Sequence, residues 1–240
     1  TMQMSLLGLA YTHSDLGGFA GGETFDKEMY IRWLQYGVFQ PIYRPHAQEA
    51  IAPEPIFHDQ ETQNIIRGYF NLRYKLLPYN YSLAYENSKT GMPLMRPIFF
   101  EDENNSSLIA IKDSYLWGDA FLVSPITEPG VKSQAMYVPQ GTWFNFWNDD
   151  RIIGQGVKSV SVDLTTLPIL VRAGSFIPML GQSSLQTTKD YDPTNLLVHY
   201  YADATVTQSR YQMYDDDGLT AQPLVNKNYE LIEFTAKQDS

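Results

Sequence analysis

Asp15 and His46 are the two side chains whose types and positions best suit chemistry on a polar ligand. Each follows a candidate β-strand and precedes a candidate α-helix, and they lie 31 residues apart. That separation is close to the roughly 30 residues of one βα unit in a (β/α)8 barrel. Active sites of such barrels form at the C-terminal ends of the strands. The spacing therefore predicts that both side chains face one barrel mouth.

Each of these residues also has a purely structural interpretation. Asp15 can turn the chain by bonding the backbone ahead of Gly17 and Gly18, and a lone histidine after Arg-Pro often anchors a loop. Phe19 can offer its face to a sugar ring or close an apolar barrel end. Residue type alone leaves these alternatives open.

The elements that would position these residues occupy the first 91 positions. Strand candidates run from Ser5 to Tyr11 and from Val38 to Tyr43. One helix is expected from near Thr24 to Gly37, and a longer one follows Asp59, with a kink at Pro78 and a stop at Gly91. This alternation predicts two βα units of a parallel sheet or barrel.

After Gly91 the pattern changes to short strand candidates separated by proline and glycine turns, which predicts an all-β sandwich. They are Tyr115–Val123, Ala135–Val138, Val157–Leu164 and Ile169–Ile177. A polar stretch over 182–195 resembles a linker, and Leu196–Tyr201 and Arg210–Tyr214 start a second, partial β module. The fold class is thus α/β followed by all-β.

Composition excludes several classes of function. The net charge of −10 and the lack of a Lys/Arg run argue against nucleic acid as a partner. The absence of cysteine excludes disulfides, thiolate metal sites and a cysteine nucleophile. No apolar stretch approaches the ~18 residues of a membrane helix, so no membrane partner is expected. The compartment stays open.

No motif for a cofactor or a metal stands out. The run of three aspartates from Asp215 to Asp217 before Gly218 resembles the start of a calcium loop, but it lacks the alternating ligands and the distal glutamate, which favours a tight acidic turn. Packing is the preferred role for Trp33 and for the tryptophans of the β region, although the latter also suit carbohydrate stacking. Those tryptophans are Trp117, Trp143 and Trp147.

Several segments resemble, in the right order, motifs of glycoside hydrolase family 31. In the first part these are Ser-Asp-Leu-Gly-Gly-Phe at 14–19, the helix at 30–39, Tyr-Arg-Pro-His at 43–46, and the segments 72–79 and 91–97. In the β part they are 118–125, 139–143, 171–178 and 214–218. The resemblance covers nearly the whole chain and weakens only beyond Gly218.

The resemblance implies the last two βα units of a (β/α)8 barrel over residues 1–91, a proximal β-sandwich over 92–181 and part of a distal β-sandwich over 182–240. It implies a retaining α-glycosidase, similar to α-glucosidases, that acts on α-linked oligosaccharides without a cofactor. Asp15 and His46 would hydrogen-bond the sugar in subsite −1, and Phe19 would line that pocket.

The same resemblance implies that the catalytic carboxylates lie elsewhere. Retaining enzymes use two carboxyl groups about 5–5.5 Å apart, and in this family both are aspartates on earlier barrel strands. Glu23 and Glu54 match neither motif, so no catalytic residue is assigned within the 240 residues. The departure at 53–57 from the family's usual aromatic after Glu-Pro leaves that loop undefined.

The apolar run from Ser5 starts almost at once, which predicts an upstream portion that completes the barrel and makes the isolated chain inactive. The alternative is a non-catalytic carbohydrate-binding or scaffold module built from the sandwich. An upstream reading frame encoding a strand of the Trp-x-Asp-Met-Asn-Glu type would favour the enzyme.

Overall fold

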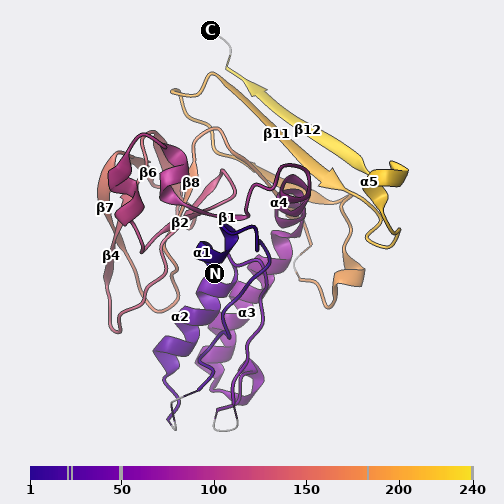
Figure 1. Ribbon diagram of the computed structural model, residues 1–240. Helices are drawn as coiled ribbons and strands as arrows, with labels where there is room; N and C mark the ends of the chain where they lie inside the picture. The colour runs from indigo at the N-terminus through magenta and orange to yellow at the C-terminus, as the bar shows by residue number, and fades with distance from the viewer. Residues whose placement is uncertain (21, 23, 49–50, 183, 239–240) are drawn as a thin grey trace.

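The computed structural model describes residues 1–20, 22, 24–48, 51–182 and 184–238. Its helices are α1 (Met2–Ser5), α2 (Lys27–Gly37), α3 (Gln60–Lys75), α4 (Leu77–Thr90) and α5 (Pro223–Asn226), with short 3-10 helices η1 (Pro55–Phe57), η2 (Ile98–Glu101), η3 (Ser106–Ala110) and η4 (Thr188–Asp190). Figure 1 shows α2 and α3 below, the main sheet at upper left, a β-ribbon at upper right and α4 between the two. No helix in the described ranges is long and apolar enough to cross a membrane.

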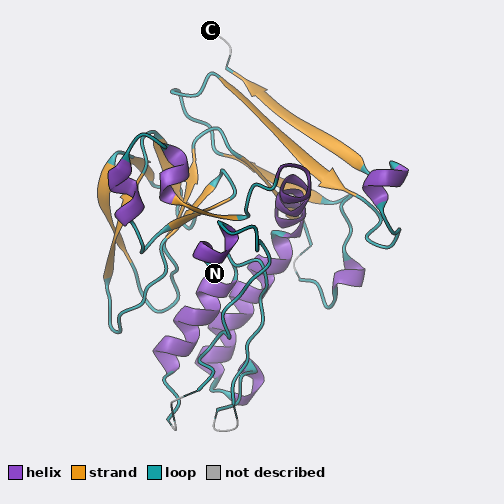
Figure 2. Ribbon diagram, in the orientation of Figure 1, coloured by secondary structure: helices purple, strands orange, loops and turns teal. Residues whose placement is uncertain are grey.

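The described strands all follow the long helices in the sequence. Figure 2 shows them in orange, mostly in the upper part of the molecule. They are β1 (Met95–Pro97), β2 (Tyr115–Trp117), β3 (Phe121–Val123), β4 (Ser133–Val138), β5 (Thr142–Asn145), β6 (Arg151–Ile153), β7 (Gly156–Ser161), β8 (Ile169–Arg172), β9 (Phe176–Leu180), β10 (Leu196–Tyr200), β11 (Gln208–Asp215) and β12 (Glu230–Lys237).

Helix α2 begins later than predicted. Asp26, not Thr24, is its N-cap, and the carboxylate accepts a hydrogen bond of 2.9 Å from the Met29 amide. Its short side chain reaches the unsatisfied amides of the first turn, which explains why aspartate is favoured there. The predicted end at Gly37 is confirmed.

The long helix is two helices. Asp59 caps α3 as predicted. The break between α3 and α4 lies at Leu76, two residues before Pro78, where the kink was predicted. Proline is tolerated within the first turn of a helix, and Pro78 takes that position in α4. Gly91 ends α4 with a left-handed backbone.

The prediction of two strands before α3 is wrong, because the described residues form no regular strand there. Residues 2–5 form α1, the following residues form turns, and Val38–Tyr43 forms turns and bends. Within the described ranges one parallel bridge, Leu16 to Pro45, joins the two regions. A parallel strand needs a partner along its full length to satisfy its backbone groups, and one bridge supplies only a fraction of that.

The main sheet has the order β1-β2-β3-β8-β5-β6 with antiparallel neighbours. Two strand candidates are split. Tyr115–Val123 forms a hairpin that turns at Gly118, and Ile169–Ile177 divides between β8 and β9, which belong to different sheets.

Each face of this sheet buries a different partner. One face contributes Leu116, Leu122, Trp143 and Leu170 to a core shared with Met136, Val138 and Val160 of the β4–β7 pair. The other face packs on α3 and α4. Alternating side chains along each strand make both contacts possible.

The C-terminal strands continue this arrangement. Strand β10 pairs with β9 across the predicted boundary at 181/182, and β11 pairs with β12. Strand β11 lies against α4, where the Tyr214 amide donates a 3.0 Å hydrogen bond to Ser82 Oγ. The acidic run forms a tight turn, in which Asp216 and Asp217 accept backbone hydrogen bonds from Gly218, Leu219 and Thr220.

Candidate functional site

The segments that carry Asp15 and His46 are joined by backbone hydrogen bonds. The Leu16 amide donates to Arg44 O and the His46 amide donates to Leu16 O, each at 3.3 Å, and the Gln48 amide donates to Phe19 O at 2.8 Å. The predicted proximity of the two segments is therefore present in the structure.

Gly17 allows this close approach. Its φ of +95° is rarely adopted by other residues, and a Cβ atom there would lie 2.7 Å from the Tyr30 ring. Gly37 serves the same contact from α2, since a Cβ atom would lie 2.4 Å from Leu16 Cδ1. Leu16 is fully buried between these elements. Glycine at both positions thus sets the depth at which the Asp15 segment sits on α2.

Asp15 is paired with a cation. Arg44 Nη2 donates a 2.8 Å hydrogen bond to Asp15 Oδ1. His13 Nδ1 lies 4.0 Å from the same oxygen and 2.7 Å from Ser14 O, a carbonyl that only accepts, so Nδ1 carries a proton. The Asp15 side chain is about 30% exposed.

Phe19 and His46 lie face to face. Their ring centroids are 5.3 Å apart with an interplanar angle of 29°. His46 is half-buried and Phe19 is 41% exposed. The pair presents an aromatic surface beside an imidazole that can donate or accept one hydrogen bond.

Three residues that support this region were not predicted to do so. Arg44 holds Asp15, and Trp33, expected to be core, is only partly buried and donates from Nε1 to Ser14 Oγ at 2.9 Å. Gln40 bonds both the amide and the hydroxyl of Ser14 at 3.3 Å. The cationic Arg44 next to the histidine motif was the available signal. A helical tryptophan gives no such signal, because its polar nitrogen is invisible to a hydrophobic pattern.

Arg73 fixes the chain that leads into Arg44. Its guanidinium donates to the carbonyls of Val38, Gln40 and Pro41 at 2.6, 2.8 and 3.0 Å. Burial lowers the pKa of Arg73 to about 10. These bonds replace the strand ladder that Val38–Tyr43 lacks, and so they hold the approach to His46.

The loop after His46 is held by aromatic packing. The His58 ring stacks on Phe25 at 4.1 Å, and Tyr30 donates from its hydroxyl to Pro53 O at 2.7 Å. Burial, and then the charge of Glu54, raise the pKa of Tyr30 well above its ordinary value. Tyr30 therefore stays neutral and keeps donating.

The arrangement combines three kinds of group that can contact a polar ligand. A carboxylate, an imidazole and an aromatic face suit a hydroxyl-rich ring. Glu54 is exposed at the start of η1, and Glu23 lies outside the described residues. Among the described residues no cluster of three or more His, Asp and Glu side chains could hold a metal ion.

The tryptophans of the β region are mostly packing residues. Trp117 and Trp143 are fully buried. Trp147 is 43% exposed, and its Nε1 donates to Leu167 O at 2.7 Å. The packing role is confirmed for Trp117 and Trp143.

Comparison with known proteins gives one consistent result. Residues 1–83 match the model for the glycosyl hydrolases family 31 TIM-barrel domain, and residues 91–177 match that for the family's C-terminal domain. An α-xylosidase of Saccharolobus solfataricus is 33% identical over 99% of the chain and 32% of its own length. Alpha-glucosidase 2 of Bacillus thermoamyloliquefaciens is 34% identical over 91% of the chain and 27% of its own length.

A solved structure agrees over the same extent. The family 31 dextranase of Flavobacterium johnsoniae, in complex with isomaltotriose, superposes with a TM-score of 0.90 at 28% identity, covering 99% of this chain and 29% of that one. The chain spans less than a third of the length of these three proteins. Two matched models of one family in consecutive order, together with these relatives along almost every residue, show that the chain belongs to glycoside hydrolase family 31.

Proposed function

We propose that the chain supplies part of subsite −1 of a retaining, α-glucosidase-like glycosidase that hydrolyses O-glycosidic bonds of α-linked oligosaccharides. Asp15 and His46 hydrogen-bond hydroxyls of the bound sugar, and Phe19 lines the pocket. The observation that carries the proposal is the Leu16–Pro45 bridge, which brings the two predicted segments together with Phe19 stacked on His46. Hydrogen bonds to a carboxylate each contribute about 1.5–3 kcal/mol.

The proposal assigns the chain to three parts of a longer enzyme. Residues 1–91 are the last two βα units of the barrel, 92–181 the proximal sandwich and 182–240 part of the distal sandwich. The remaining barrel units are the proposed partner of the first part. Leu7 and Leu9 support this, because they are 75% and 50% exposed in a run that reads as a buried strand.

In this proposal the reacting carboxylates come from the partner units. One of them attacks the anomeric carbon to form a covalent glycosyl intermediate while the other protonates the departing oxygen. The second group then takes a proton from the water that releases the sugar, and the two groups lie about 5–5.5 Å apart. Asp15 and His46 stay on one side of the sugar, where their hydrogen bonds strengthen as the ring gains oxocarbenium character. The relatives named above include a xylosidase, a glucosidase and a dextranase, so the sugar class is α-linked and its identity follows from partner residues.

The test uses the complete enzyme that contains this chain, with nitrophenyl α-glucoside and α-xyloside as substrates. Replacing His46→Ala is expected to lower kcat/KM by about 10- to 100-fold, or ~1–3 kcal/mol, through the lost hydrogen bond. His199→Ala is the matched control, because His199 is exposed on β10, and it should leave kcat/KM unchanged. An unchanged kcat/KM in His46→Ala removes His46 from the site.

The isolated 240-residue chain provides the second arm. It is expected to show no turnover of either substrate, with intact mass confirming that no other polypeptide is present. Turnover by this chain would place a carboxylate pair within it and overturn the assignment.

A further inference from the structure

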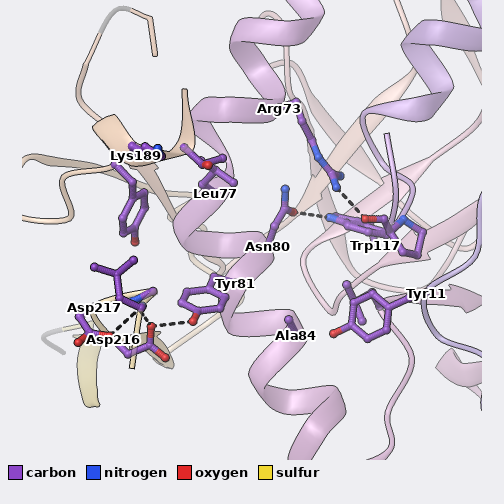
Figure 3. Close-up of a pocket in the computed structure, with 16 residues that line it drawn as sticks. Tyr11, Arg73, Leu77, Asn80, Tyr81, Ala84, Trp117, Lys189, Asp216 and Asp217 are labelled. Carbon is purple, nitrogen blue, oxygen red and sulfur yellow. Dashed lines mark hydrogen bonds between the residues drawn. The ribbon is translucent and has the colours of Figure 1, made fainter. Parts of the chain in front are cut away.

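A hollow lies where α4, the main sheet and the C-terminal segments meet. It encloses about 640 Å³, within the ~300–1,000 Å³ typical of small-ligand sites. Its lining contains none of Asp15, Phe19 and His46. Figure 3 shows Tyr81 and Asn80 of α4 between Trp117 and Tyr11 on one side and Lys189 and the acidic turn on the other.

Aromatic rings form much of its wall. Tyr11, Tyr81 and Tyr191 line it from three separate segments, and all three are partly or largely accessible. Two of them are fixed by their hydroxyls: Tyr81 donates to Asp216 at 2.7 Å and Tyr191 donates to Asp215 at 3.1 Å. Fixed rings offer apolar faces at low entropic cost, which is how proteins hold the C–H face of a sugar.

The charged groups of the lining balance. Arg73 and Lys189 carry positive charge, and Asp216 and Asp217 carry negative charge. Much of the hydrogen-bonding capacity of Arg73 is taken by three backbone carbonyls, and Asp217 accepts from the backbone and hydroxyl of Thr220. A lining of balanced charge favours an uncharged ligand over an anion or a cation.

One buried donor in the wall has no partner. Asn80 is 91% buried, and its Oδ1 accepts a 2.9 Å hydrogen bond from Trp117 Nε1. Within the described residues its Nδ2 donates to nothing. Figure 3 shows this nitrogen turned away from Trp117. This nitrogen is itself shielded from solvent, so Asn80 contributes to the wall through its bond to Trp117 and offers no free donor to a ligand in this conformation.

We propose that this cavity binds a neutral oligosaccharide, with Tyr191 and Tyr81 as stacking faces and Lys189 and Asp217 as polar partners. The inference is independent of subsite −1, because the two sets share no residue. It identifies a second sugar contact formed jointly by the α4 helix and the C-terminal segments.

The test is titration of the 240-residue chain, after a cooperative urea transition has shown that it is folded, with maltotriose and isomaltotriose, followed by saturation-transfer NMR and calorimetry. Tyr191→Ala is expected to weaken binding at least tenfold, whereas Tyr191→Phe, which keeps the ring and loses the hydroxyl, stays within threefold of the parent. Tyr137→Ala on β4 is the matched control for removing a half-buried tyrosine elsewhere. It should leave affinity unchanged.

His46→Ala separates this site from subsite −1. Binding that survives His46→Ala and is lost in Tyr191→Ala supports the cavity. No binding of either trisaccharide, binding lost only with His46→Ala, or an equal loss in Tyr191→Ala and Tyr137→Ala overturns the proposal. The subsite −1 proposal is judged on turnover by the complete enzyme and is unaffected by these outcomes.

Discussion

Similar apolar side chains are buried in the six-stranded sheet and exposed in the first part of the chain. Leu170 in β8 is fully buried between two antiparallel neighbours, whereas Leu7, in a run of comparable apolar character, is 75% exposed. Strand β8 takes its neighbours β3 and β5 from distant parts of the sequence. The described residues supply no strand partner to the run around Leu7, so the difference lies in the available neighbours and not in the apolar pattern.

The largest expected effect sharpens this comparison from the side of the sheet. Trp143 is fully buried, donates to Pro139 O at 3.0 Å and lies 4.3 Å from the Arg172 guanidinium. Replacing Trp143→Ala should lower the free energy of unfolding by about 3–5 kcal/mol, as measured by urea denaturation. Trp147→Ala, at a 43% exposed position, should cost much less. Equal losses would mean that the sheet core is not the stabilising part.

The second prediction concerns the depth of the Asp15 segment. Gly17→Ala places a Cβ atom 2.7 Å from the Tyr30 ring at a φ of +95°. The cost should be about 1–3 kcal/mol of stability, measured by thermal and urea unfolding. Gly68→Ala is the control, since nothing lies within 4 Å of a Cβ there and α3 should gain up to ~1 kcal/mol. A neutral Gly17→Ala would show that the segment is not held against α2.

The third prediction separates function from stability. Arg44→Met removes the cation that orients Asp15, and because the pair is partly exposed the free energy of unfolding should change by less than ~1 kcal/mol. In the complete enzyme kcat/KM should fall about fivefold, or ~1 kcal/mol. Arg210→Met breaks an exposed pair with Glu233 on the C-terminal ribbon and should change neither quantity. A normal kcat/KM in Arg44→Met would mean that Asp15 does not depend on Arg44.

The smallest effect is a pH dependence. Hydrogen bonding by the Thr62 amide, and then by Lys27, lowers the pKa of Asp59 below its ordinary 3.8. A depressed folded-state pKa gives stability that is complete above about pH 4 and is lost as pH falls through the lower folded value. Asp59→Asn keeps a good N-cap but abolishes this titration. Its melting temperature should fall less than that of the parent between pH 5 and pH 2, and parallel curves would contradict the assignment.

The fold was predictable where structure is local. Asp59 and Gly91 mark helix ends through capping and left-handed backbone, and turn residues marked most strands of the β region. The sequence did not reveal that Ser5–Tyr11 and Val38–Tyr43 form no regular strand. The apolar pattern of each run is typical of a strand, but the described residues supply no strand partner for it. Pairing of β9 with β10 across the expected linker is a long-range contact that no periodicity encodes.

The candidate site followed the same division. The proximity of Asp15, Phe19 and His46 follows from motif order and spacing, and the bridge between their segments agrees with it. The residues that support the site were not predicted. Trp33 and Arg73 each act through hydrogen bonds from side-chain nitrogens to distant parts of the chain, and tertiary packing, which a sequence pattern does not encode, brings those partners together.

The bond from the Tyr214 amide to Ser82 Oγ, with Tyr81 donating to Asp216, has a consequence for recombination within the family. A crossover after Gly91 separates Tyr81 and Ser82 from the strand and turn they were matched to. A crossover before Leu77 keeps α4 with its own ribbon. Helix α4 and the segments after it should therefore be exchanged together. Chimeras between family members with the crossover before Leu77 should fold more often than those with the crossover after Gly91.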